Sequence, residues 1–235
     1  MIKVISIFCV ASIILGVLGF TIFMLLRRQQ RHKSAFNQFA QQQNFMLFES
    51  SPAIEPFHDK LNHFDFFRTG SHSRIRRLIQ GQHSDNPVEI MLATLTQGGM
   101  NQGFTDEYVM IHWQHNRLHL PHFTLQPKGY AVERALNALL VGEAPEVTLS
   151  DYASLAKQYR LTGAEPEAVS NLFSQGLGNY LDRQVQQSIH RSLEGFENQF
   201  LFYTYCKEEI KLDALYQLYE ESKQVLKLLE QASTD

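Results

Sequence analysis

The first hydrophobic pattern in the chain is an unbroken run over residues 4–26, which contains no charge, proline or side-chain amide. As a helix this run would reach roughly 35 Å, enough to cross the hydrocarbon core of a bilayer with some tilt. Because Arg27 and Arg28 follow it and no small-residue cleavage site does, we predict a retained transmembrane helix. The alternatives are a cleaved signal peptide, for which the run is too long, and a buried helix of a soluble fold, for which it is too apolar on every face.

Farther along the chain the pattern changes to short apolar or alternating runs, which predict strands. The clearest of them cover residues 74–80, 88–95, 107–113 and 118–125, with shorter candidates at 147–149 and 159–161. Pro121 lies inside the fourth run and cannot donate a ladder hydrogen bond, so it predicts an edge or a bulge there. Residues 188–193 and 199–205 predict a hairpin that turns at Glu194-Gly195.

Helical spacing appears in the segments between and after these strands. A glutamine-rich segment at 34–43 has Phe36, Phe39 and Ala40 on one side, and we interpret it as a stalk that leads out of the membrane. Residues 51–56 contain two prolines and predict a loop. Helices are expected at 132–140, from Pro166 through Leu181, and over the stripe from Leu212 to Leu229, which has Ser222 in its seam.

Together these elements predict an α+β fold, with an N-terminal transmembrane helix followed by a mainly antiparallel sheet and packed helices. We divide the chain into an anchor and basic collar at 1–33, a stalk helix and linker at 34–50, and a cytosolic α+β domain at 51–235. The sequence has no GxGxxG fingerprint and no regular βαβ alternation, which disfavours a doubly wound nucleotide-binding fold.

The charge distribution bears on the location and the partners. Five of the 21 Lys and Arg lie at or before residue 33 and none of the 24 Asp and Glu do, so the remainder carries 16 basic and 24 acidic residues, a formal charge of −8. An acidic domain disfavours nucleic-acid binding. The basic collar of Arg27, Arg28, Arg31 and Lys33 favours a cytoplasmic domain on a single-pass protein of the bacterial inner membrane, with the bilayer as partner.

The two cysteines agree with that orientation. Cys9 lies in the apolar run and Cys206 in the domain, so no disulfide forms within the domain. Such usage is typical of a reducing compartment.

Four histidines, His112, His115, His119 and His122, fall within eleven residues and raise a metal hypothesis, with His112 and His119 as the ligand candidates. In a straight strand, however, His112 and His115 point to opposite faces, as do His119 and His122. No HExxH or HxH pattern is present. The alternative is a set of surface and edge-strand histidines.

Arg74, Arg76 and Arg77 form a basic group in the acidic domain. They are candidates for binding a lipid phosphate at the membrane surface. The alternative is a solvated strand edge that its charges protect from aggregation.

No catalytic residue and no cofactor can be assigned from the sequence. There is no GxSxG elbow, and Cys206 has no identifiable base partner, which favours a structural thiol.

Three segments carry a resemblance to a known family. They are residues 120–128 (LPHFTLQPK), residues 159–163 (YRLTG) followed by Val169 and Leu172-Phe173, and residues 200–203 (FLFY) before a closing helix. The chain resembles an uncharacterised family of single-pass bacterial membrane-anchored proteins with an LPxFxLxP signature, over about residues 35–230. The aspartate-rich strand usual in that family is replaced here by residues 146–149 (EVTL). The resemblance implies the fold and the anchor, and it implies no activity.

The sequence therefore leads to a functional hypothesis of a non-catalytic binding or scaffolding module on the cytosolic face of the inner membrane, with a protein partner still to be identified. The alternatives are a membrane-tethered hydrolase that uses histidines and acids gathered by the fold, and a domain that binds anionic lipid through Arg74, Arg76 and Arg77.

Overall fold

The computed structural model describes residues 20, 34–49, 51–69, 72–97, 104–128 and 144–233. The predicted anchor at 4–26, apart from Phe20, lies outside the described residues, as do the collar residues Arg27, Arg28, Arg31 and Lys33 and the predicted helix at 132–140. Among the helices that can be described, none is both long enough and apolar enough to span a bilayer.

One eight-stranded sheet organises the described residues, and all its neighbouring strands are antiparallel. The strand order is β1-β2-β3-β4-β8-β7-β5-β6, so the late hairpin β7–β8 is inserted between β4 and β5. The strands are β1 (Met46–Phe48), β2 (His72–His83), β3 (Asn86–Gln97), β4 (Phe104–Gln114), β5 (Leu120–Pro127), β6 (Tyr159–Gly163), β7 (Ser192–Glu197) and β8 (Gln199–Tyr205).

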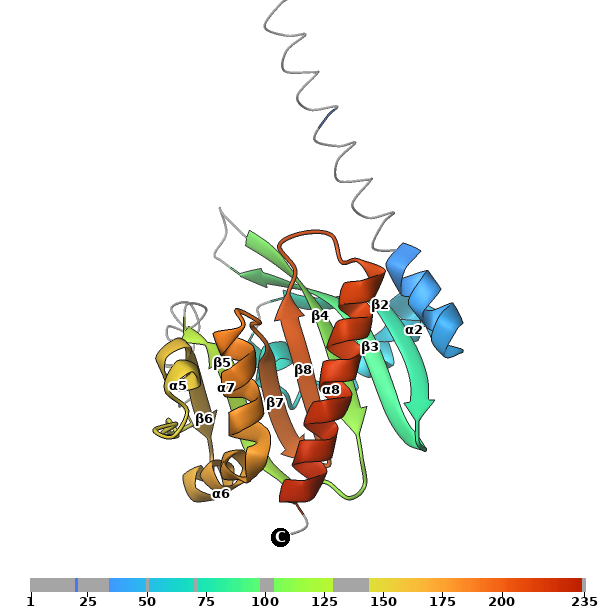
Figure 1. The fold of residues 1–235 in the computed structure, drawn as a ribbon. Helices are drawn as coiled ribbons and strands as arrows, with labels where there is room; N and C mark the ends of the chain where they lie inside the picture. The colour runs from blue at the N-terminus through green and yellow to red at the C-terminus, as the bar shows by residue number, and fades with distance from the viewer. Residues whose placement is uncertain are drawn as a thin grey trace, which may run out of the picture.

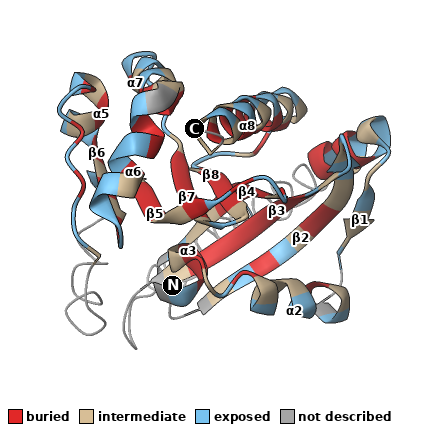
Figure 2. Ribbon diagram, turned by 90° about the horizontal axis from the view of Figure 1, so that it is seen from below, coloured by how far each residue is buried: buried red, intermediate tan, exposed pale blue. Residues whose placement is uncertain are grey.

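Helices cover both faces of this sheet (Figures 1 and 2). On the first face lie α5 (Ala153–Gln158), α6 (Pro166–Leu172), the π-helical turn η2 (Phe173–Leu177), α7 (Gly178–Gln186) and α8 (Leu212–Ala232). On the second face lie α2 (Ser51–Lys60) and the short α3 (Asp65–Thr69), which pack on a separate hydrophobic cluster.

The long helix α8 attaches to the first face through the stripe that its sequence predicts. Leu215, Ser222 and Leu229 are fully buried in it. The Trp113 indole N–H donates to Ser222 Oγ at 3.0 Å, so the polar residue in the seam satisfies a buried donor. The Tyr219 ring lies nearly parallel to the Trp113 ring, with centroids 6.0 Å apart.

The N-terminal helical residues 34–43 pack as part of this body. Phe36 and Phe39 are fully buried in the first-face core, and the Phe39 ring lies 4.7 Å from the Tyr216 ring of α8. The next residues form β1, which pairs with β2. Burial of two aromatic side chains, each of which removes a large apolar area from water, joins this segment to the domain rather than leaving it as a separate stalk.

The α+β prediction with a large antiparallel sheet and packed helices is confirmed, and each of the four main strand predictions corresponds to an observed strand. The Pro121 prediction is confirmed as a bulge: between Leu120 and Phe123 the pairing of β5 with β7 shifts by one residue. The strand itself is not an edge, because β6 and β7 flank it.

Three local predictions are wrong. Residues 51–56 are helical and begin α2, which keeps Pro56 inside. Residues 147–149 make no strand, and only Glu146 forms an isolated bridge with Thr162. The hairpin does not turn at Glu194-Gly195, because both residues lie within β7. The turn is at Glu197-Asn198, between the paired residues Phe196 and Gln199, and Glu197 has a φ of 53°.

Candidate functional site

A row of polar side chains crosses the second face of the sheet. The strand registers pair Glu89 with His112, His112 with Leu201, Leu201 with Glu194, and Glu194 with Thr124. Directly paired residues of antiparallel strands point to the same face, so these side chains form one line across five strands. All five residues are buried, and Leu201 alone among them is apolar. We call Glu89, His112, Glu194 and Thr124 the polar row.

At one end of the polar row, Glu89 and His112 form a buried pair. His112 Nδ1 lies 2.5 Å from Glu89 Oε2, and His112 Nε2 lies 2.9 Å from Gln199 Oε1. Lys60 Nζ donates to the other oxygen of Glu89 at 3.2 Å. Burial opposes ionisation of Glu89, but His112 and Lys60 more than offset it, so the pKa of Glu89 lies below its usual value. Both ring nitrogens of His112 are thus engaged.

The start of α3, with the residues just before it, docks on the polar row. The Thr124 hydroxyl donates to Asp65 Oδ2 at 2.8 Å, and the Phe66 backbone N–H donates to Glu194 at 3.2 Å. His63 of the same segment lies against the Phe196 ring, with centroids 4.6 Å apart. Burial, with the nearby His112 and His122 charges, lowers the pKa of His63 to about 4, so His63 is neutral at physiological pH.

Glu194 is the most enclosed carboxylate of the row, with no exposed surface. Besides the Phe66 N–H, it accepts the Tyr203 hydroxyl at 2.7 Å and the Gln126 side-chain amide at 3.4 Å. The Gln126 amide also donates to the Tyr203 hydroxyl at 3.0 Å. A buried carboxylate with this many donors fixes the orientation of the groups around it.

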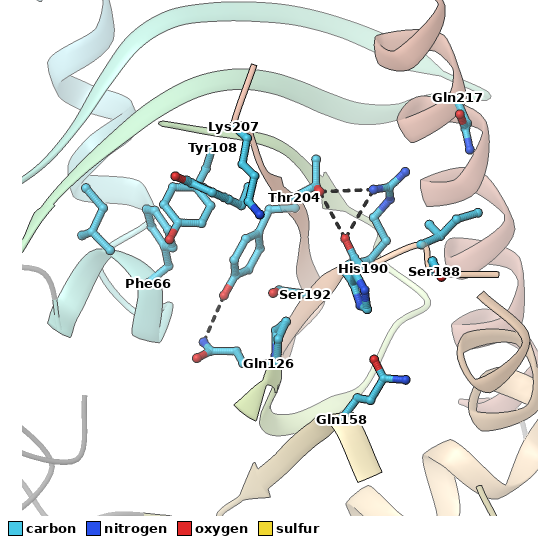
Figure 3. A pocket seen from close by; sticks show the side chains of 16 residues that line it. Phe66, Tyr108, Gln126, Gln158, Ser188, His190, Ser192, Thr204, Lys207 and Gln217 are labelled. Carbon is cyan, nitrogen blue, oxygen red and sulfur yellow. Dashed lines mark hydrogen bonds between the residues drawn. The ribbon is translucent and has the colours of Figure 1, made fainter. Parts of the chain in front are cut away.

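Next to Glu194, a cleft of about 770 Å³ opens at the end of the sheet where β7 begins and β8 ends. Tyr203 and Gln126, the two side chains that Glu194 holds, line it. Figure 3 shows Phe66 and Tyr108 on one side, His190, Ser188 and Gln217 on the other, and Lys207 reaching in from the rim. A volume of this size is typical of small-molecule sites.

The lining of the cleft differs in charge from the rest of the domain. Among the described residues that line it there is no Asp or Glu, and its ionisable basic side chains are His190, Arg191 and Lys207. Arg191 is held in place: its Nε donates to Glu221 of α8 at 2.7 Å, and its Nη1 donates to Thr204 Oγ1 at 3.1 Å. Lys207 is exposed and has no ion-pair partner among the described residues.

The two metal-ligand candidates are not brought together. His112 is buried in the polar row, whereas His119 is exposed in the connection that precedes β5. His115 binds Glu230 of α8 through Nε2 at 2.7 Å, and His122 lies 3.7 Å from Asp65. Within the described parts of the chain, no group of three or more His, Cys, Asp or Glu side chains could hold a metal ion.

The three arginine candidates lie on β2, which is next to the edge strand β1. Arg76 is the extra residue of a bulge between Ile75 and Arg77. Arg74 and Arg76 are exposed, while Arg77 is partly buried and pairs with Glu49 at 2.8 Å. None of the three arginines lines the cleft, and no residue of β2 is among the described lining residues.

The comparisons with known proteins bear on the fold alone. No family model and no curated protein matches the chain. Among solved structures, the chain is similar to the crystal structure of the mycobacterial trehalose monomycolate transport factor A, TtfA, with a TM-score of 0.55 and 10% sequence identity. The similarity covers 87% of this chain and 93% of that one, so it extends over most of both chains.

Proposed function

We propose that this protein is a non-catalytic binding module, held at the cytosolic face of the bacterial inner membrane by its N-terminal segment, and that the cleft is its binding site. The observation that carries the proposal is the cleft itself, which has the size of a ligand site. Two of its lining side chains, Tyr203 and Gln126, are held in place by hydrogen bonds to the buried Glu194. Groups that are oriented before binding lose little conformational entropy when a ligand arrives.

The rival hydrolase function fits this geometry less well. A general base must have a ring nitrogen free to take a proton from a bound substrate. His112 is 1% exposed, and both its nitrogens are already in contact with Glu89 and Gln199. His119, the other histidine candidate, is exposed and lies outside the residues that line the main cleft.

The placement at the membrane is supported by the apolar run at 4–26, the basic collar after it and the absence of a possible disulfide. TtfA is named as a transport factor, which agrees with a binding role for a protein of this fold. The bilayer is one partner in this proposal, and the occupant of the cleft is the other.

The proposal can be tested in cells that produce the full chain with a C-terminal tag. We expect the protein to stay in the membrane fraction after alkaline carbonate washing. The tag should be protected from protease in spheroplasts and cleaved in inside-out vesicles. Cleavage of the tag in intact spheroplasts would contradict the cytosolic placement.

The cleft can be tested in the same cells with a photo-crosslinking amino acid at position 207, on the rim. The matched control carries it at position 227, which is also an exposed lysine but lies on α8 outside the cleft lining. We expect a covalent adduct of defined mass at 207 and none at 227. The same adduct at both positions, or turnover of generic ester or phosphate substrates by the purified chain, would overturn the proposal.

A further inference from the structure

We infer that the cleft binds an amphiphile with an oxyanion at one end: Lys207 and Arg191 hold the anion, and the apolar part packs against Phe66, Tyr108 and Tyr205. This inference rests on the proposed function, because it names the ligand class of the same cleft. It follows from three properties of the lining, which are its charge, its aromatic wall and its fixed hydrogen-bond donors.

The charge of the lining is opposite in sign to that of the domain. Residues from 34 onward have a formal charge of −8, yet none of the described residues that line the cleft is an Asp or Glu. Glu208 and Glu209 follow Lys207 in the chain and are also outside the lining. In an otherwise acidic domain, the charged side chains described in the lining, Arg191 and Lys207, are both cationic, which favours an anion over a cation of the same shape in the cleft.

The two cations have different roles. Glu221 neutralises much of the Arg191 charge, since its oxygen lies 2.7 Å from Arg191 Nε. Arg191 therefore supplies N–H donors in a fixed orientation, because Thr204 and the His190 carbonyl also hold its Nη1. Lys207 has no such neutralising partner among the described residues, so it supplies most of the attraction for an oxyanion.

The other side of the cleft is aromatic. The Phe66 and Tyr108 rings lie edge to face with centroids 5.0 Å apart, and the Tyr205 ring lies 5.6 Å from the Tyr108 ring. Tyr205 is only partly buried. A wall of this kind stabilises a flat ring or an acyl chain by burial of apolar surface. A simple inorganic anion would leave it in contact with water.

The chemistry is shared by two sources, a membrane lipid with a phosphate headgroup and a water-soluble aryl or alkyl phosphate. Calorimetric titration of the full chain in nanodiscs, with empty nanodiscs as the blank, distinguishes them. The probes are 2-naphthyl phosphate, dihexanoyl phosphatidic acid, 2-naphthol and inorganic phosphate. We expect at least one of the two phosphate amphiphiles to bind about tenfold or more tightly than both 2-naphthol and inorganic phosphate. Which of the two binds identifies the source.

Two variants locate the contacts. Lys207→Glu should weaken binding of the phosphate amphiphile by about tenfold, whereas Lys227→Glu, with the same charge change on exposed α8, should leave it within about twofold. Tyr205→Ser should weaken binding of the phosphate amphiphile and leave the weak affinity for inorganic phosphate unchanged. Thermal unfolding of each variant verifies that the fold is intact.

The outcomes separate this inference from the proposed function. Equal affinity for 2-naphthol and 2-naphthyl phosphate would overturn the anion assignment, while a cleft that binds apolar molecules would remain. Binding that Lys207→Glu does not weaken would overturn it as well. If none of the amphiphiles binds, the ligand class is wrong. The crosslinking experiment at position 207 then decides separately whether the cleft binds anything at all.

Discussion

On the first face of the sheet, Leu193, Phe200 and Phe202 pack into one apolar core with α8, whereas on the second face the same two strands present Glu194, Leu201 and Tyr203. The first face obtains its stability from the non-directional burial of apolar surface. The second face has an apolar cluster of its own beneath α2 and α3, and it adds buried hydrogen bonds whose partners come from α2, α3 and β5. The cleft opens beside the second arrangement, where side chains have fixed directions and a ligand can be recognised by its polar groups.

The largest effect that distinguishes the two faces is expected from Phe36→Ala. This side chain is fully buried in the first-face core, so its truncation should lower the free energy of unfolding by about 3–5 kcal/mol in urea denaturation. Gln41→Ala, at an exposed position of the same helical segment, is the control. A change below about 1 kcal/mol for Phe36→Ala would mean that residues 34–43 are a stalk outside the cooperative fold.

On the second face, replacing Glu89 alone should lower the free energy of unfolding more than replacing both Glu89 and His112. Glu89→Leu leaves His112 and Lys60 without their acceptor and should lower the free energy of unfolding by about 3 kcal/mol. The double variant Glu89→Leu/His112→Leu should recover most of that loss, because the partners it leaves unpaired, Lys60 and Gln199, are only partly buried and can reach water. Urea denaturation of the two single variants and the double variant measures the coupling. If the losses of unfolding free energy in the two single variants add up to that of the double variant, Glu89 and His112 do not stabilise the fold as a pair.

Gly195→Ala tests the corrected position of the β7–β8 turn. In β7 a Cβ at residue 195 would overlap the Phe123 ring, so the variant should be destabilised by about 2 kcal/mol. Combining it with Phe123→Leu should restore part of the loss, since the smaller side chain leaves room for the new methyl group. If Gly195 stood in an exposed turn, the Phe123 substitution would have no effect on the cost of Gly195→Ala.

A smaller effect is expected at the hydrogen bond between Trp113 of β4 and Ser222 of α8. Ser222→Ala removes the acceptor of the Trp113 indole N–H and should cost about 1 kcal/mol in thermal or urea unfolding. Ser174→Ala, at an exposed serine of η2, is the matched control and should cost less. Equal losses of unfolding free energy in the two variants would show that the hydrogen bond from Trp113 to Ser222 adds no stability.

The second face should also give stability a pH dependence through His63. The pKa of His63 is about 4 in the folded protein, below the value of about 6.5 for a free histidine. The unfolded chain therefore binds the proton first as the pH falls, so stability that is present above pH 6.5 is lost between about 6.5 and 4. His63→Asn should flatten the curve of unfolding free energy against pH over that interval. An unchanged slope would assign the pH dependence to other groups.

The sequence pattern predicted the first face well and the second face poorly, for a physical reason. Alternation in β4 places Val109, Ile111 and Trp113 on one face, and these residues are buried. The intervening Tyr108, Met110 and His112 are buried too, because helices cover both faces of the sheet. Alternation normally separates buried from solvated positions, so it gives no sign that the second set is also inside.

The cleft could not be found from local sequence, because its parts come from distant segments. Glu194 with Gly195 has the composition of a turn, and its burial depends on Phe66, which is 128 residues away in the chain. Gln126 and Tyr203 are 77 residues apart and meet only after the β7–β8 hairpin inserts between β4 and β5. The one local sign of the cleft was a charged residue, Glu194, next to apolar residues of a predicted strand. A solvated turn would give the same sequence pattern.

The central claim, that the cleft at the end of the sheet is a binding site, is tested most directly by amide hydrogen exchange of the full chain with and without 2-naphthyl phosphate. We expect added protection centred on residues 188–192 and 203–207, which border the cleft, and unchanged exchange at residues 225–229 of α8, which lie outside its lining. Protection spread evenly over the chain, or centred on β2 with Arg74, Arg76 and Arg77, would contradict it.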